Sequence, residues 1–287
     1  MQQVLIIGFG KLGSSLARLL QKNRAVTLRI MDVRPYESAF TAVIGKDAYF
    51  NEISASLIES SHFIFICTAD DQIPDVVSRL QSFSLKNKFV VHTSGATDAE
   101  ILNVLRKQGA AIGSFHPLQT FNIPFLPAEH WQSIYCTFQG DAKILASLKE
   151  LLRNNGPKII QVDGTQKKAV HLAAVVAANF QTALYTWAAE ILAEAGIDNI
   201  SAGKLLGPLA EQTARNFSQK TLQEILSGPI QRGDLGTIRE HVNYLCQHGD
   251  ETSLRLYRLL SEKLLQNDKL PVQNRDLLMA FFKTIKD

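Results

Sequence analysis

Cysteine is scarce in this chain, with three residues in 287, and they lie far apart in the sequence. Cys67, Cys136 and Cys246 form no C-x-x-C pair and have no ligand pattern beside them. The usual signatures of a disulfide framework and of a structural zinc site are therefore both missing. We expect a cytoplasmic protein with reduced, buried thiols and without a bound metal.

Long apolar runs and strong charge are also missing. The longest nearly apolar stretch, 169–178, is interrupted by His171 and is too short to span a bilayer. No basic segment opens the chain, so neither a secretion signal nor a membrane span is predicted. The net charge is only +3, without a long basic run, which argues against a nucleic-acid partner.

The chain does have enough apolar sequence for two hydrophobic cores. Hydrophobic residues make up 46% and charged residues 20%, as in folded globular proteins, and 287 residues suffice for about two domains. Strand-like runs alternate with helical ones as far as residue 163, whereas every later segment has helical spacing. This pattern predicts an α/β fold: a Rossmann-type parallel-sheet domain over 1–163 and an all-helical domain over 164–287.

The expected elements follow from hydrophobic periodicity and from turn residues. After a first strand at the start of the chain, strands are predicted at 27–31, 47–50, 63–67, 89–92, 110–115, 131–138 and 158–162. Helices are predicted at 14–20, 56–60, 72–80, 98–108, 142–153, 166–195, 200–217, 235–247, 253–266 and 272–285. The aperiodic stretch 118–129 is a candidate active-site loop, although it could be an ordinary surface excursion.

The most informative stretch is 4–13, where an apolar strand runs directly into G-x-G-x-x-G. Gly8 would make the tight turn, Gly10 would let a pyrophosphate approach the backbone, and Gly13 would allow close packing of helix and strand. The free N–H groups at the start of the next helix favour a phosphate. The alternative is a purely structural tight loop. The cofactor residues predicted in this stretch are Gly8, Phe9, Gly10, Lys11, Leu12 and Gly13.

The residues at the end of the second strand give conflicting signals about the cofactor. Asp32 follows the glycine motif by about twenty residues and would accept hydrogen bonds from the ribose hydroxyls of NAD. Arg34 could instead pair with the 2′-phosphate of NADP. NADP is preferred weakly, by analogy with biosynthetic reductases, and NAD is the alternative.

Ligands of open α/β sheets bind outside the carboxyl ends of the strands. This rule adds Thr68, after the strand at 63–67, to the cofactor residues. It also makes Ser94, after the strand at 89–92, a substrate contact. His116 ends the strand at 110–115 and is expected in the pocket, with a purely structural use as the alternative.

Three polar residues, Lys168, His171 and Asn179, fall on one stripe of the helix predicted at 166–195. Hydride transfer to a carbonyl needs a proton donor for the developing alkoxide, which Lys168 or His171 could be, with Asn179 orienting the oxygen. Alternatively, Lys168 is solvated, and His171 and Asn179 find their hydrogen-bond partners within the protein. Arg232, in a glycine-flanked loop, could hold a carboxylate bidentately or be an ordinary surface charge.

Three segments resemble a known family of Rossmann-like oxidoreductases that carry the helical domain of unknown function 2520. They are the strand end at 113–121, the helix segment from Lys168 through His171 to Asn179, and the loop at 228–234. The resemblance implies a relation to the ketopantoate reductase and β-hydroxyacid dehydrogenase class. It implies a catalytic lysine early in the first long helix with a histidine or asparagine one turn later, matched by Lys168 and His171. The asparagine that usually follows is absent, since residue 172 is leucine, and Asn179 is a possible substitute. The resemblance also implies a homodimer through the helical domain.

The predicted function is an NAD(P)H-dependent reductase of a small carboxylate substrate that is a 2-oxo acid. Ketopantoate, and hence pantothenate biosynthesis, is the preferred assignment. A reductase of pyrroline-5-carboxylate is the alternative within enzymes, and a dinucleotide sensor without turnover is the alternative outside them. A polar stripe beside the predicted nicotinamide site argues against a sensor, because a sensor needs no proton donor.

Overall fold

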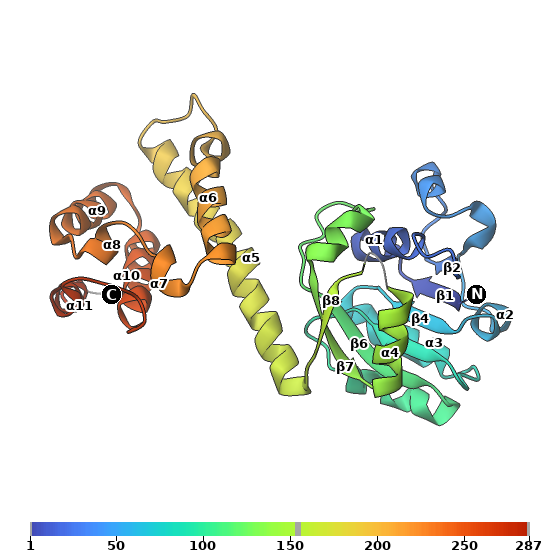
Figure 1. Ribbon diagram of the computed structural model, residues 1–287. Helices are drawn as coiled ribbons and strands as arrows, with labels where there is room; N and C mark the ends of the chain where they lie inside the picture. The colour runs from blue at the N-terminus through green and yellow to red at the C-terminus, as the bar shows by residue number, and fades with distance from the viewer. Residues whose placement is uncertain (1, 153–155, 286–287) are drawn as a thin grey trace. The chain divides into compact units, whose positions relative to one another are not determined.

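The computed structural model describes residues 2–152 and 156–285 (Figure 1). As far as residue 161 the chain alternates strands with helices, the 3₁₀ helices being labelled η. The order is β1 (Gln2–Ile7), α1 (Lys11–Leu20), β2 (Val26–Met31), η1 (Ser38–Ala42), η2 (Lys46–Ala48), β3 (Tyr49–Phe50), α2 (Ala55–Glu59), β4 (Phe63–Ile66), η3 (Asp70–Gln72), α3 (Ile73–Leu80), β5 (Phe89–His92), η4 (Ala99–Gln108), β6 (Ala111–Pro117), η5 (Ala128–Ser133), β7 (Tyr135–Gly140), α4 (Ala142–Leu151) and β8 (Lys158–Gln161).

The strands form a sheet in the order β3-β2-β1-β4-β5-β6-β7-β8. From β3 to β6 all neighbours are parallel, as predicted, and the order 3-2-1-4-5-6 is that of a Rossmann fold. The strand order reverses between β1 and β4, so the carboxyl ends of these two strands bracket the crevice in which ligands of such sheets bind.

A departure from the predicted parallel sheet occurs at its far edge, where β7 pairs antiparallel with β6. The described connection between β6 and β7 contains only the short 3₁₀ helix η5, and antiparallel neighbours need no helical crossover. The strand predicted at 131–138 was therefore wrong at its start, because residues 128–133 form η5. The predicted helix 98–108 is likewise the 3₁₀ helix η4, and the predicted end of α4 at Arg153 lies outside the described residues.

Two hydrophobic cores cover the two faces of the sheet, because successive strand residues point to opposite sides. Val4 and Phe65 belong to the face packed by α1 and α4, whereas Leu5 and Ile66 belong to the face packed by α2, α3 and η4. Both cores consist of fully buried aliphatic and aromatic side chains, which makes the carboxyl edge of the sheet a rigid platform. Of the thiols predicted to be buried, Cys136 is buried and Cys67 is partly so, but Cys246 is exposed.

After β8 the described chain contains helices and no further strand. They are α5 (Gly164–Glu194), α6 (Ala202–Gln219), α7 (Leu222–Ile225), α8 (Pro229–Arg232), α9 (Leu235–His248), α10 (Glu251–Leu265) and α11 (Arg275–Phe282). Asp234 caps α9 by accepting a hydrogen bond from the backbone N–H of Thr237. Among the described helices, none combines the length and the apolar character needed to cross a membrane.

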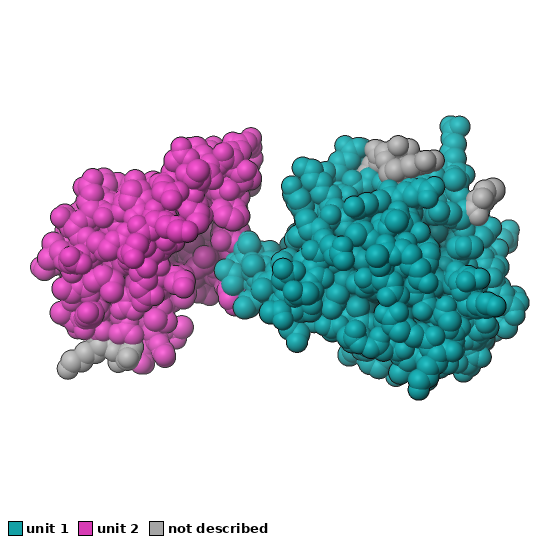
Figure 2. All heavy atoms as spheres, turned by 60° about the horizontal axis from the view of Figure 1, so that its bottom comes forward, with its two compact units in different colours: residues 1–179 teal, residues 180–287 magenta. Residues whose placement is uncertain are grey.

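The chain divides into two compact units, residues 1–179 and 180–287, coloured separately in Figure 2. The division falls within α5, whereas the predicted domain boundary lies just before this helix. The first half of α5 therefore belongs to the same unit as the sheet. The second half belongs to the helical unit, where the indole N–H of Trp187 donates to Ser253 Oγ at 3.1 Å.

Candidate active site

The glycine loop joins the end of β1 to the start of α1 at the reversal of strand order. Gly8 has a φ of 95°, which favours glycine, and a side chain at Gly13 would lie 2.0 Å from the carbonyl oxygen of Gly8. At Gly10, by contrast, an added Cβ would meet no atom within 4 Å. The loop is therefore tightly packed at both ends, and its middle leaves open space through which a phosphate can reach the backbone.

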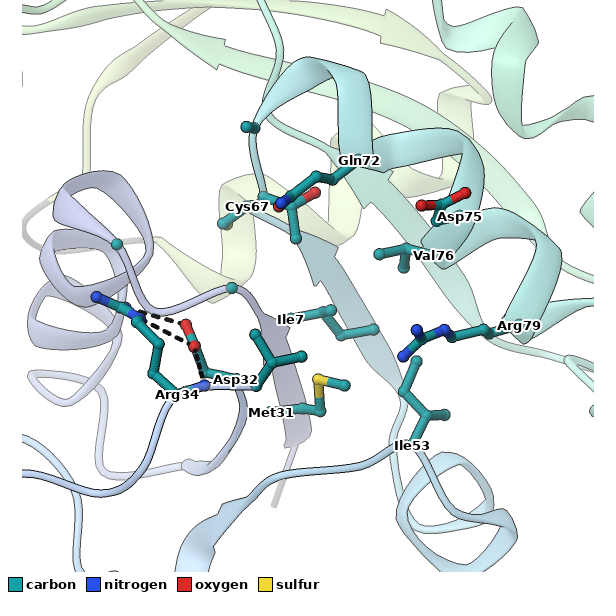
Figure 3. Close-up of a pocket in the computed structure, with 15 residues that line it drawn as sticks. Ile7, Met31, Asp32, Arg34, Ile53, Cys67, Gln72, Asp75, Val76 and Arg79 are labelled. Carbon is teal, nitrogen blue, oxygen red and sulfur yellow. Dashed lines mark hydrogen bonds and ion pairs between the residues drawn. The ribbon is translucent and has the colours of Figure 1, made fainter.

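A cavity of about 380 Å³ lies beside this loop (Figure 3). Its walls come from the ends of β1, β2 and β4 and from α3, and the lining residues are Ile7, Gly8, Gly10, Met31, Asp32, Val33, Arg34, Ile53, Cys67, Thr68, Ala69, Gln72, Asp75, Val76 and Arg79. The hydroxyl of Thr68 is buried and has no hydrogen-bond partner among the described residues. The open backbone, the cavity and this unpaired hydroxyl fit a dinucleotide.

The other predicted cofactor residues of the loop lie outside the cavity lining. Phe9 packs its ring against Phe40 and Phe125 in the core, so that only its backbone belongs to the site. Lys11 is exposed and Leu12 is half-buried in the first turn of α1, where the backbone N–H groups lack partners within the helix.

Asp32 and Arg34 form an ion pair at the cavity wall, with 3.0 Å between Oδ2 and Nη2. Asp32 is 7% exposed and also accepts a hydrogen bond of 2.5 Å from the backbone N–H of Phe9. Burial opposes the charged carboxylate, but the hydrogen bonds from Arg34 and Phe9 outweigh it, and the pKa of Asp32 lies below its ordinary value. Asp32 is therefore ionised at neutral pH.

A second polar cluster lies at the carboxyl ends of β5 and β6, centred on Lys167. Its ammonium donates to the backbone oxygen of Ser94 at 2.7 Å and to Ser114 Oγ at 2.6 Å, and the residue is 2% exposed. Ser94 Oγ in turn donates to Asp70 Oδ2 at 2.7 Å. Burial lowers the pKa of Lys167 to about 8, although the carboxylates of Asp98 and Asp70 oppose this shift.

The lysine in this cluster is thus Lys167 and not its predicted neighbour Lys168, which is exposed. Successive helix residues are about 100° apart around the axis, so only one of two adjacent lysines can face the strand ends. The spacing from Lys167 to His171 is four residues, which also places the two on one face.

Two histidines adjoin the lysine cluster. His116 and His171 have ring centroids 5.7 Å apart, and a Cβ on Gly95 would lie 2.5 Å from His171 Nδ1 and 2.7 Å from His116 Nε2. His116 Nδ1 lies 3.1 Å from the carbonyl oxygen of Thr93, which can only accept, so Nδ1 carries a proton. Burial lowers the pKa of His116, and the positive charge of Lys167 lowers it further. His116 is therefore neutral near pH 7, with Nε2 as an acceptor.

A groove of about 580 Å³ extends from these histidines along the first half of α5. Its lining residues are His116, Pro117, Leu118, Gln119, Thr120, Val170, His171, Ala173, Ala174, Val175, Ala177, Ala178 and Asn179. The beginning of the predicted active-site loop contributes Leu118 and Thr120. The later part of that loop is held on α1, where Ser14 Oγ and Ser15 Oγ accept from the backbone N–H groups of Phe125 and Leu126.

The structure therefore brings Ser94, His116 and His171 together and lines the same groove with Asn179, whereas Lys168 is exposed. Arg232 belongs to the other unit, is exposed, and has its Nη2 3.8 Å from Asp234 Oδ2. Lys167 and Ser114 were missed from the sequence. The two adjacent lysines were the signal in the sequence, but which of them faces the strand ends depends on how α5 packs. Among the described residues, no group of three or more His, Cys, Asp or Glu side chains could hold a metal.

Two family models match parts of this chain. Residues 3–95 match the family described as NADP oxidoreductase, coenzyme F420-dependent. Over these residues the chain resembles an NADP oxidoreductase domain. Residues 134–264 match the domain of unknown function 2520, which confirms the predicted resemblance. The NADP oxidoreductase match ends at residue 95, before α5, so it does not identify the substrate that reacts with the cofactor.

Solved structures share the fold over most of the chain. A candidate NADP oxidoreductase from Bacteroides fragilis is 24% identical, covers 91% of this chain and 97% of its own, and has a TM-score of 0.68. A protein from Thermotoga maritima is 23% identical, covers 91% of this chain and 96% of its own, and has a TM-score of 0.70. A reductive aminase from Aspergillus terreus, in complex with NADPH and ethyl-5-oxohexanoate, is 16% identical. It covers 98% of this chain and 99% of its own, with a TM-score of 0.65. No curated protein matches the chain.

The NADP oxidoreductase match over residues 3–95 confirms the predicted enzyme class and cofactor: the chain is an NAD(P)-dependent oxidoreductase. The solved structures confirm its Rossmann fold.

Proposed function

We propose that this oxidoreductase reduces a C=O or C=N bond of a small organic substrate bound in the groove beside His116 and His171. The observation that supports this most strongly is Lys167, a buried cation held by Ser94 and Ser114 next to these two histidines. A dinucleotide-binding protein without turnover would gain nothing from burying an ammonium group there, because burial of a charge costs free energy.

NADPH supplies a hydride when it is bound, and the chain must supply the proton. Two of the three ammonium protons of Lys167 are engaged by Ser94 and Ser114, which leaves one to donate. With a pKa of about 8, Lys167 is largely protonated at neutral pH and gives up a proton more readily than an exposed lysine. Neutral His116 offers Nε2 as an acceptor that can orient a substrate N–H or O–H group.

For the substrate, a short 2-oxo acid remains the first hypothesis, with ketopantoate as the compound to test. Arg232, the predicted carboxylate partner, lies in the helical unit and is near Asp234. The groove lining contains neither arginine nor lysine, and the ammonium of Lys167 beside the groove is already held by Ser94 and Ser114. This apolar lining favours a neutral imine or ketone as the second candidate, and reductases of imines are among the proteins with the same fold.

The test is a panel of ketopantoate, other short 2-oxo acids, pyrroline-5-carboxylate and a neutral cyclic imine, with NADPH consumption followed by absorbance. Turnover of at least one compound supports the proposal, and turnover of none removes it for these classes. Lys167→Met should lower kcat by ~10²- to 10⁴-fold, as expected for a lost general acid. The matched control Lys168→Met should change it less than about threefold. Equal losses in the two variants would contradict the assignment to Lys167.

The proposal includes a homodimer formed through the helical region. Along α5, Leu172, Val176 and Phe180 are exposed at intervals of four residues, and Lys167 is the one fully buried residue of this fully described helix. Light scattering should give twice the chain mass, and Phe180→Asp should reduce it to that of a monomer. Val104→Asp, at an exposed apolar residue of η4, is the control. A monomeric wild-type chain would refute the dimer.

A further inference from the structure

The carboxylate of Asp32 has no acceptor site left for a ribose hydroxyl. Its Oδ1 accepts from the backbone N–H and from Nε of Arg34, at 2.9 and 3.0 Å. Its Oδ2 accepts from the backbone N–H of Phe9 at 2.5 Å and from Nη2 of Arg34 at 3.0 Å. A carboxylate offers about four lone-pair sites, and here four N–H donors occupy them. In the usual dinucleotide fold this acid would have to accept from the ribose.

Arg34, by contrast, keeps N–H donors that no acceptor uses. Its Nε and Nη2 are used by Asp32 and by the carbonyl oxygen of Phe9, the latter at 2.8 Å. The Nη1 amino group has no hydrogen-bond partner among the described residues, and the side chain is 50% exposed at the cavity wall (Figure 3). Arg34, which is one of the lining residues, therefore keeps unused donors, and these suit an anionic acceptor better than a hydroxyl that must donate.

The backbone of Arg34 is held independently of its side chain. Its carbonyl oxygen accepts from Tyr49 Oη at 3.0 Å and from Asn51 Nδ2 at 2.7 Å. Asn51 Nδ2 also donates to the carbonyl oxygen of Asp32 at 2.9 Å. With the backbone fixed in this way, the ion pair with Asp32 decides where the guanidinium points, and little side-chain entropy remains to be lost on binding.

We propose that Asp32 is a positioning residue that orients Arg34 toward the 2′-phosphate of NADPH, and not the acceptor for the ribose hydroxyls of NADH. The acid that the usual fingerprint associates with NAD thereby contributes to selection of NADP. Asp32 acts through Arg34, and Arg34 makes the phosphate contact through Nη1.

The two roles of Asp32 predict changes of opposite direction in cofactor affinity. If Asp32 accepts from the ribose, Asp32→Asn removes a negative charge near the 2′-phosphate, so that NADPH binds more tightly and NADH more weakly. If Asp32 orients Arg34, the same substitution leaves too few acceptors for the guanidinium. NADPH should then bind about 10-fold more weakly, with NADH affinity changed less than about twofold.

The experiment measures dissociation constants of NADPH and NADH by nicotinamide fluorescence, so it needs no substrate and does not depend on the reaction proposed above. A double-mutant cycle of Asp32→Asn with Arg34→Met isolates the coupling. We expect Asp32→Asn to weaken NADPH binding in the wild-type background and to have no further effect in the Arg34→Met background. Lys107→Met, at an exposed lysine of η4, removes one positive charge as Arg34→Met does and is the matched control for that variant.

Arg34→Lys gives a second test that leaves Asp32 intact. Lysine keeps the charge but cannot engage both carboxylate oxygens and a phosphate with a planar fork, so NADPH affinity should again fall about 10-fold. Tighter NADPH binding by Asp32→Asn would overturn the proposal. So would wild-type NADPH affinity in Arg34→Lys, or an unchanged effect of Asp32→Asn in the Arg34→Met background.

Discussion

The buried lysine predicts a pH dependence of stability that can be measured without knowing the substrate. Lys167 has a pKa of about 8 in the folded chain, against 10.5 for an ordinary lysine. Between these values the unfolded chain binds a proton that the folded chain has released, so the free energy of unfolding rises with pH. From pH 8 to pH 10.5, at about 1.4 kcal/mol for each pH unit, the rise attributable to Lys167 is about 3 kcal/mol.

The perturbation that isolates this contribution is Lys167→Met, which removes the charge but keeps most of the side-chain volume. The variant also loses the hydrogen bonds to Ser94 and Ser114, which costs about 1 to 3 kcal/mol for each acceptor left unpaired. That cost does not vary over this pH range. The difference in unfolding free energy between wild type and variant should therefore change by about 3 kcal/mol in favour of the wild type as the pH rises. Other lysines and tyrosines that titrate in this range cancel in the difference.

Urea unfolding followed by tryptophan fluorescence can report on the sheet unit alone. Of the two tryptophans, Trp131 is fully buried in the core of that unit and Trp187 lies in the helical unit. In a Trp187→Phe background the signal comes from Trp131. A wild-type minus variant difference that stays constant within about 0.5 kcal/mol across this range would refute the buried, charged state of Lys167.

The glycines give three further predictions. Gly13→Ala places Cβ 2.0 Å from the Gly8 oxygen, so the melting temperature should fall sharply, and an unchanged value would contradict this packing. Gly10→Ala meets no atom within 4 Å, so calorimetry should show normal stability while NADPH titration shows weakened binding. Gly95→Ala would displace His171, whose Nδ1 would be 2.5 Å away, so turnover should fall while NADPH affinity is retained. Equal losses of turnover and affinity would place Gly95 in the cofactor site instead.

Local sequence signals predicted the elements around the site well, because each depends on residues close together in the chain. Buried apolar runs predicted β4 and β5, and the helical spacing of apolar residues after β8 predicted the long helix α5. The antiparallel β7 was missed, since strand direction depends on the path of the whole connection between β6 and β7.

The sequence by itself determined the position of the glycine loop, the strand ends that border the crevice, and the residue types available there. Only the tertiary structure decided which side chains meet. Lys167 and Lys168 are adjacent and chemically identical, and the packing of α5 against the ends of β5 and β6 buries one and exposes the other. Likewise, Asp32 and Arg34 are two separate cofactor signals in the sequence, whereas in the fold they form one hydrogen-bonded unit. Pairwise contacts of this kind depend on side-chain direction, which neighbouring residues alone do not determine.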